Sequence, residues 1–338
     1  MSVTTLPEVE VTATRLPPTP SPVAPAPSAT PPAVPAPAAI PAPAYVVRKV
    51  DLTFMLAQGS FGQSGFNTIK LSGLRCSATV VIAGAQSMTT LHLTVWGMTL
   101  DQMNSLSTLG QQILIDRRNM VMVEAGDAVS GMTKVFTGTI QNAYVDGTSQ
   151  PDVSFVVEAF VGLTDALKPV PASSFRAPVN VANVMQSFAG AMGYAFENHG
   201  VNVTLHDSYF PGTGREQVRA CAEAANIDWI IENNSLVIWP KGTARGNDIP
   251  VISPDTGMHN YPAFNQQGII VSVTFNPALA YGMNVKIVSQ LSGACGVWQI
   301  YALTHQLEAE MPSGQWVSTV MAGHIGAPTV VTSPVSAT

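Results

Sequence analysis

Most of this chain alternates between apolar and polar residues with a period of two, the pattern of strands that bury one face. Residues 46–167 contain six or seven such runs, rich in β-branched and aromatic residues, including LRCSATVVIAG, LHLTVWGM and VSFVVEAFVG. The pattern returns from residue 243, in GIIVSVTFN, GMNVKIVSQ, GVWQIYALTHQLEAE and GQWVSTVMAGHI. The sequence therefore predicts a mainly β protein with two antiparallel β domains, at 46–167 and 243–330, and a C-terminal tail at 331–338.

Two short segments shape the first β domain. TLDQMNSLSTLG predicts one short helix, in which Thr99 and Gln102 form a capping box and Gly110 ends the helix. DGTSQPD is rich in turn residues and predicts a hairpin between the last two strands.

Residues 168–242 have a different character and predict a small α/β domain between the two β domains. After a proline-containing linker, NVANVMQSFAGAMG predicts a helix with Asn180 as its N-cap. Two short strands, YAFEN and VNVTL, precede a second helix that begins with the capping box of Thr213 and Glu216. IDWIIENNSLVIWP then predicts a hairpin that turns at its two asparagines. The apolar face of the first helix is expected to comprise Val181, Val184, Met185, Phe188 and Met192.

The first 45 residues form a proline-rich arm. Residues 16–44 hold twelve prolines and no charge, a composition that favours extended polyproline II over a packed core. At ~3.1 Å per residue this segment spans roughly 90 Å, enough to reach a neighbouring subunit. The composition leaves two alternatives open, a strap docked on neighbours and an unattached linker. The candidate contact residues of the arm are Pro17, Pro25, Pro35 and Pro43.

The chain is poor in charge. Charged residues make up 11% of it, against about 25% in ordinary globular proteins, while hydrophobic residues make up 46%. Such a surface is typical of a protein that is covered by partners in an assembly. The net charge of −6 and the absence of a basic cluster argue against nucleic acid as a partner.

Signals for export and for redox chemistry are missing. The N-terminus has no cationic segment followed by an apolar core, and no stretch is continuously apolar for 18 residues, so we expect assembly in a bacterial cytoplasm and no membrane insertion. Cys76, Cys221 and Cys295 are an odd number without a CxxC pair, and we expect buried free thiols.

A search for catalytic or cofactor motifs gives only weak candidates. The sequence has neither GxSxG nor HExxH, and PGTGREQV lacks the lysine of a phosphate loop, so helix capping explains it. Glu308 and Glu310 lie on the same face of one predicted strand, where a solvated strand edge is the simpler interpretation than a hydrolase pair. We therefore predict no enzyme, no cofactor and no metal site.

Three residues near the C-terminus are candidates for interface contacts. His305 is expected to be structural or at an interface, because no acidic partner is placed beside it. Trp298 and Trp316 lie in predicted strands, where core packing is the first interpretation and interface anchoring the second.

The two β domains resemble each other. A shift of 162 residues aligns the segment from NMVMVEAG to VVEAF with that from YGMNVKIV to STVMA, after one register step. Identities are few, and they include Val123 with Val285 and Gly131 with Gly293. Both segments have the order strand, glycine-containing bend and long hairpin, which predicts a pair of related β domains.

The C-terminal segment FNPALAYGMNVKIVSQLSGACGVWQIYALTHQLEAEMPSGQWVSTVMAGH resembles the closing domain of baseplate hub proteins from contractile-tailed phages, the Mu-like hub family. The pattern is Asn276 and Pro277, a glycine before a strand, then two arms of one hairpin. The first arm carries Gly296, Trp298 and His305, and the second carries Gly314, Trp316 and Thr319. The middle domain is also similar to the insert of such hubs, whereas the arm departs from the family pattern.

The resemblance implies a non-enzymatic virion protein. In that family the hub is a homotrimer whose chains each contribute two tube-like β-barrel domains, so six similar domains match the sixfold tail tube while the threefold symmetry receives the spike. It implies the tail tube protein, the spike protein and possible contact with the tape-measure protein as partners, and the arm is expected to contact other baseplate subunits.

Three alternatives stay open at this point. The first is a hub-like component of another contractile injection system. The second is a hub-linked peptidoglycan hydrolase. The third rests on LPEVEVTATR, which resembles the opening of outer-membrane TonB-dependent receptors, but the chain is too short for their strands and shows no signal peptide.

Overall fold

The computed structural model describes residues 47–324, apart from 63–64, 85–86, 109–118, 128, 130 and 149. The predicted arm, its four candidate prolines and the C-terminal tail lie outside the described residues. No helix among the described residues is long and apolar enough to cross a membrane.

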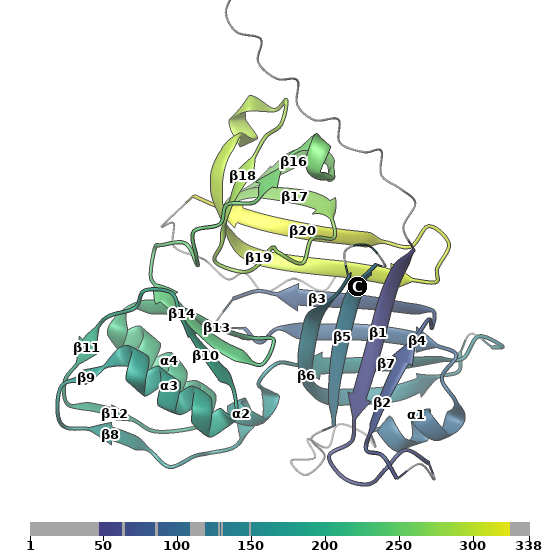
Figure 1. Ribbon diagram of the computed structural model, residues 1–338, viewed down its shortest axis with the longest axis horizontal. Coiled ribbons are helices and arrows are strands. Elements are labelled where there is room, and N and C mark those ends of the chain that lie inside the picture. Colours follow the sequence, from purple (N-terminus) through teal and green to yellow (C-terminus); the bar gives the residue numbers. More distant parts are fainter. Residues whose placement is uncertain are drawn as a thin grey trace, which may run out of the picture. The chain divides into compact units, whose positions relative to one another are not determined.

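The first β region contains seven strands and two short helices (Figure 1). The predicted helix is α1, and its capping box is confirmed, because the Thr99 hydroxyl accepts from the Gln102 amide and the Gln102 side chain accepts from the Thr99 amide. The helix ends at Leu106, earlier than predicted, and Gly110 lies outside the described residues. The elements are β1 (Arg48–Met55), β2 (Thr68–Ser72), β3 (Cys76–Ile82), β4 (Thr90–Trp96), α1 (Leu100–Leu106), β5 (Met120–Asp127), β6 (Gly131–Asp146), β7 (Ser154–Phe160) and α2 (Leu163–Leu167).

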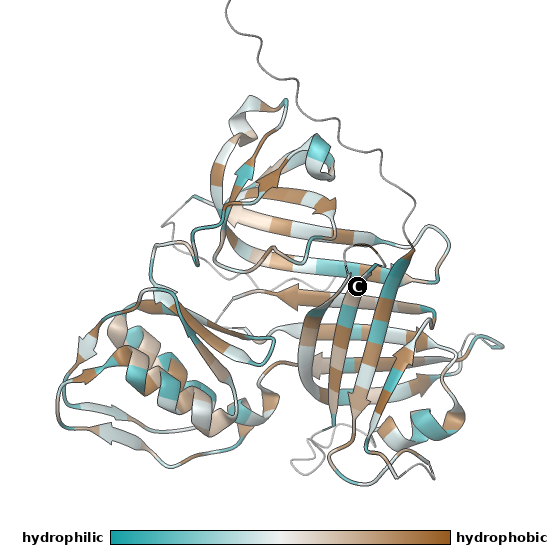
Figure 2. Cartoon of the chain, viewed as in Figure 1, coloured by the Kyte–Doolittle hydropathy of each residue, from teal (hydrophilic) through white to brown (hydrophobic). Residues whose placement is uncertain are grey.

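These strands form an antiparallel sheet in the order β3-β4-β7-β6-β5-β1-β2. The long strand β6 pairs with β5 along its first part and with β7 along its second part, and a bulge follows Ile140. Such a bulge bends a strand, so β6 can join two layers. Alternate residues point into the core, as the alternation of hydrophobic and hydrophilic residues along the strands shows (Figure 2). The largest fully buried side chains of this region include Phe54, Phe136 and Phe155.

The insert has the predicted helices and hairpin. Asn180 caps α3 by accepting from the Ala182 amide, and the capping box of Thr213 and Glu216 begins α4. The two asparagines of the hairpin have positive φ, as a tight hairpin turn requires. The elements are β8 (Ser173–Phe175), β9 (Val179–Asn180), α3 (Val181–Met192), β10 (Ala195–Asn198), β11 (Thr204–Leu205), β12 (Ser208–Phe210), α4 (Gly214–Ala225), β13 (Ile227–Glu232) and β14 (Ser235–Pro240).

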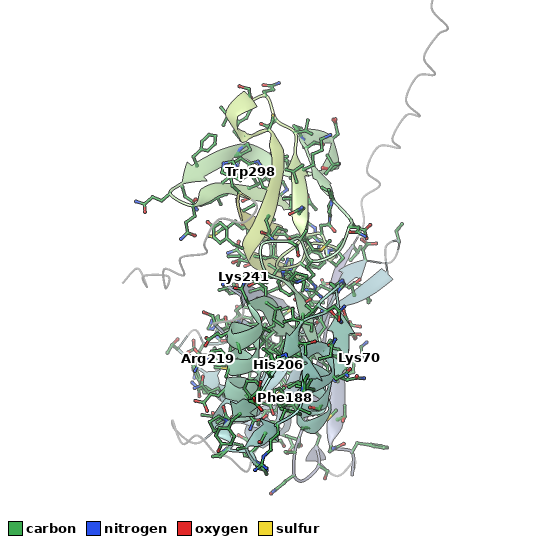
Figure 3. The ribbon with its side chains drawn as sticks, turned by 90° about the vertical axis from the view of Figure 1, so that its left-hand side faces the viewer. Lys70, Phe188, His206, Arg219, Lys241 and Trp298 are labelled. Atoms are coloured by element: carbon green, nitrogen blue, oxygen red, sulfur yellow. The ribbon has the colours of Figure 1, made fainter. Side chains whose placement is uncertain are left out.

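The two helices pack together beside the three-stranded sheet β10-β14-β13. The apolar face of α3 is buried as predicted except at Met192, which is half-buried. Phe188, which is labelled in Figure 3, is buried and meets Phe210 edge to face, with ring centroids 6.0 Å apart. Phe188 and Phe210 are therefore part of the buried core in the insert.

The second β region has six strands, four of which the sequence predicts. The two additional strands are β15 and β16, and β16 contains a proline, Pro262. The elements are β15 (Val251–Ile252), β16 (Met258–Asn265), β17 (Gly268–Thr274), β18 (Asn284–Ile287), β19 (Gly296–Ala309) and β20 (Trp316–Gly323), with two short 3₁₀ turns at Pro254–Thr256 and Ser292–Ala294.

The two β regions share one sheet. Strand β3 of the first region pairs antiparallel with β19 of the second, so thirteen strands form one sheet whose main path ends at β16 and β2. Because the path has two ends, the prediction of closed barrels is not confirmed. The mainly β fold with an α/β insert is confirmed.

Candidate assembly surface

Five strands of each β region have the same order. The first region reads β3-β4-β7-β6-β5 and the second reads β16-β17-β20-β19-β18, and every neighbouring pair in both is antiparallel. Figure 1 shows the labelled strands of each set side by side. This shared order supports the predicted repeat.

The pairing registers identify equivalent residues in the two sets. In the first set one row across the sheet consists of Val80, Leu91, Ala159 and Ile140. In the second set the corresponding row consists of Phe264, Ile269, Ala322 and Ile300.

Irregularities in the two long strands fall at the same place. The register shifts between Ile140 and Asn142 in the first set and between Ile300 and Ala302 in the second. Since both long strands carry the shift directly after the row, β6 corresponds to β19 with an offset of 160 residues at this point, close to the 162 of the sequence alignment.

Within the chain, two strands pair with the same edge of β19. Its first part pairs with β18 and its second part pairs with β3. The pairs Leu303 with Ile82 and Leu307 with Ala78 are buried, so these positions of the joint between the two β regions are apolar. Beside the pair of Leu307 and Ala78, the Ser77 hydroxyl of β3 donates to the Glu308 carboxylate of β19 at 3.1 Å.

Strand β16 ends the main path of the sheet and exposes apolar residues. Tyr261 and Phe264 are 65% and 56% exposed, far more than most large apolar side chains of the sheet. The strand has a bulge between His259 and Ala263, with Pro262 inside it. Proline in a sheet is confined to edges and bulges, so HNYPAFN was the signal for an edge strand that the sequence reading missed.

The second half of β6 is the other exposed apolar edge. The Thr108 amide donates to the Ala143 carbonyl at 2.8 Å, and the Ala143 amide donates to the Thr108 hydroxyl at 2.8 Å. The next two residues, Tyr144 and Val145, are 43% and 38% exposed. Among the described residues, no strand pairs with this end of β6 on the side away from β7.

His305, a predicted site residue, lies in the core. It is 4% exposed, its Nδ1 lies 2.8 Å from the Ser318 hydroxyl, and its ring meets Phe275 edge to face. Burial lowers the pKa of His305 to about 4, because the charged imidazolium is poorly solvated there. These contacts support a structural role for His305.

The two candidate tryptophans are also buried within the chain. The Trp298 indole donates to the Ala294 carbonyl at 2.9 Å, and the ring stacks on His324. Trp316 packs against Phe275, and the Arg48 guanidinium lies 5.8 Å from its ring centroid. The core alternative accounts for both side chains, and contact with a partner stays a prediction.

The groups with catalytic potential have structural partners. Glu308 accepts from the Gln315 amide at 2.7 Å and so fastens the β19–β20 hairpin. The Tyr194 hydroxyl of the insert donates to Asp165 of α2 at 2.5 Å, and burial raises the pKa of Tyr194. Among the described residues, no group of three or more histidine, cysteine or acidic side chains could hold a metal ion.

The cysteines are free, as predicted, but they are not all buried. Burial raises the pKa of Cys76 to about 11 and that of Cys221 to about 12. Cys295 is exposed, which corrects the prediction. It lies in a turn, where its thiol donates to the Ser289 carbonyl at 3.1 Å.

Solved structures with the same fold include two tail proteins and a chain of a PdpA–VgrG complex. The tail protein from Neisseria meningitidis MC58 matches with a TM-score of 0.56 at 9% identity, over 81% of this chain and 97% of that one. The 43 kDa tail protein of prophage MuSo2 from Shewanella oneidensis matches with a TM-score of 0.53 at 9% identity, over 81% and 96%. A chain of the lidded Francisella PdpA–VgrG complex matches with a TM-score of 0.51 at 5% identity, over 86% and 55%. This chain therefore shares its fold with these proteins.

The sequence itself identifies the family. The family model described as "Baseplate hub gp41" matches residues 74–312, more than half of the chain, so the chain belongs to this baseplate hub family. The resemblance to a phage baseplate hub is confirmed, and the chain is a structural component of a phage tail or a related injection system. No curated protein sequence matches it significantly.

Proposed function

We propose that this chain is a non-enzymatic, trimeric baseplate hub that joins the sixfold tail tube to the threefold spike of a contractile phage. The repeated five-strand order carries this proposal. Three chains with two such sets each supply six similar units to the tube, while their true symmetry stays threefold. Each set then acts as one of the two tube-like domains, at 46–167 and 243–330, with the insert at 168–242 between them.

The partners in this proposal are the tail tube protein and the spike protein. A structural neighbour belongs to a complex of PdpA with VgrG, which supports a partner in the spike position. The arm at residues 1–45 contacts other baseplate subunits, and the tape-measure protein is a candidate for the channel. Assembly takes place in the host cytoplasm before incorporation into the virion.

The proposal is tested by the mass of the complex in solution. The purified chain, alone and mixed with the tube and spike proteins of its phage, is measured by light scattering. The expected species contains three chains of 35.5 kDa each, alone or after mixing. A dimer, or a chain that stays monomeric in the mixture, would refute the proposal. Zymography of the same preparation tests the hydrolase alternative, for which a cleared band would be required.

A further inference from the structure

We propose that the free edge of β16 pairs with the end of β6 from a second copy of this chain, in the register that β3 and β19 use within one chain. The inference rests on the proposed trimer and specifies how its copies join. The segments concerned are Ala263–Asn265 of β16 and Tyr144–Asp146 of β6, which are the exposed apolar edges described above.

The template is the joint inside the chain. There Val80 of β3 lies opposite His305 of β19, and Val81 lies opposite Thr304. Val80 is completely buried and His305 is 4% exposed, so β19 covers this edge of β3. One set thus joins the next through the first strand of one and the long strand of the other.

The chain contains a second pair of strand edges that correspond to the two sides of this joint. Among the described residues, no strand pairs with either edge. Phe264 occupies in its row the position of Val80, because Phe264 pairs with Ile269 as Val80 pairs with Leu91. Val145 follows the bulge of β6 at the distance at which His305 follows the bulge of β19.

The exposed fraction of equivalent side chains differs sharply between the joint within the chain and the two free edges. Val80 is 0% exposed, whereas its equivalent Phe264 is 56% exposed. His305 is 4% exposed, whereas its equivalent Val145 is 38% exposed. The difference follows from pairing, since Val80 and His305 have a neighbouring strand on both sides. Among the described residues, Phe264 and Val145 have a neighbouring strand on one side only. Large apolar side chains at such positions indicate a surface that becomes covered.

Transferring the internal register gives specific contacts between copies. Phe264 lies opposite Val145, Asn265 opposite Tyr144, and Ala263 opposite Asp146. No like charges oppose each other in this register, and an aromatic side chain meets a β-branched one, a favourable cross-strand pair.

The irregularities at both edges limit the pairing to these short segments. On β16 the bulge with Pro262 precedes Ala263, and proline has no amide hydrogen to donate. On β6 the backbone of Ala143 is already bonded to Thr108, so a new strand can begin only at Tyr144. Pro262 also blocks a longer ladder, which protects the free chain from uncontrolled edge-to-edge association.

The geometry of the joint predicts a closed ring. Each copy uses β16 toward one neighbour and β6 toward the other, so the contact is heterologous and must either close or form a filament. Because the same kind of joint links the two sets within a chain, three copies give six equivalent joints around one ring.

Disulfide trapping tests this joint. Val145→Cys and Phe264→Cys are combined in the full chain with Cys295→Ser, which removes the one exposed native cysteine among the described residues. The protein is mixed with its tube and spike proteins, oxidised and run on a non-reducing gel. We expect covalent dimers and trimers and nothing larger, and only monomers from either single variant. The matched control pairs Val145→Cys with Val297→Cys, since Val297 is 40% exposed but lies outside the predicted joint.

The outcomes separate this inference from the proposed function. Trimers by light scattering without a disulfide in the double variant would overturn the joint and leave the hub intact. Equal trapping in the control pair, covalent chains longer than three, or a disulfide-linked complex with another protein would also overturn it. A chain that stays monomeric in the mixture would overturn the trimer and the joint together.

A charge exchange gives a second, independent readout. Phe264→Lys places a charge in the joint, and we expect it to shift the chain from trimer to monomer in light scattering. Adding Val145→Glu provides an opposite charge across the joint and is expected to restore the trimer. Failure of the pair to restore it, in variants with unchanged circular dichroism, would contradict the register.

Discussion

The buried His305 makes a quantitative prediction about acid stability. Its pKa falls from 6.5 to about 4 in the folded chain because of burial. The unfolded state therefore binds more protons between these values, and the stabilisation is complete above pH 6.5 and is lost as the pH falls toward 4. Between pH 7 and pH 5 this one group lowers the free energy of unfolding by about 2 kcal/mol.

The assay compares the wild type with His305→Gln. The glutamine does not titrate, so the part of the pH dependence that belongs to the histidine disappears in the variant, whatever the substitution costs at pH 7. Denaturant unfolding is followed by tryptophan fluorescence, because Trp316 and His305 both contact Phe275 and so report on the same region. If wild type and variant lose equal stability between pH 7 and pH 5, the reasoning about burial is wrong.

Four further predictions follow from the contacts described above. Leu307→Ala removes a fully buried side chain at the joint of the two β regions and should cost about 2–5 kcal/mol in denaturant unfolding, whereas a cost under 1 kcal/mol would contradict the packing. Thr213→Ala removes the cap of α4 and should cost about 1 kcal/mol in the same assay, while Thr213→Ser should restore it. Cys295 should react with iodoacetamide in the native chain and the two buried cysteines only after unfolding, as mass spectrometry can show. Deletion of residues 1–44 should leave the circular dichroism of the body unchanged but lower the yield of assembled baseplates, and an unchanged yield would refute the role of the arm.

Local patterns in the sequence predicted most elements of the fold. The capping boxes at Thr99 and Thr213 and the hairpin at Asn233 depend on contacts between residues close in sequence, and the structure confirms them. The period-two alternation predicted most strands for the same reason. Strand β16 was missed because Pro262 and a residue with positive φ, Asn260, interrupt its alternation.

The joint between the two β regions could not be predicted from local patterns. The side chains of Ser77 and Glu308 bond across it although they are 231 residues apart in sequence. Alternation shows that a strand has a buried face but not which strand lies beside it. The same limit explains why interface candidates could not be told from core residues in the sequence. Trp298 and Trp316 are aromatic, as interface residues often are, but both are core residues here. The exposed Phe264 and Val145 could be recognised only after the register identified their buried equivalents.

The most direct test of the hub account is electron cryomicroscopy of intact baseplates that contain this chain. The account predicts three copies per baseplate around the channel, related by threefold symmetry, with their six β sets at nearly sixfold positions against the tail tube. Six copies per baseplate, a single copy, or two β sets of one chain that do not occupy equivalent positions around the channel would contradict it.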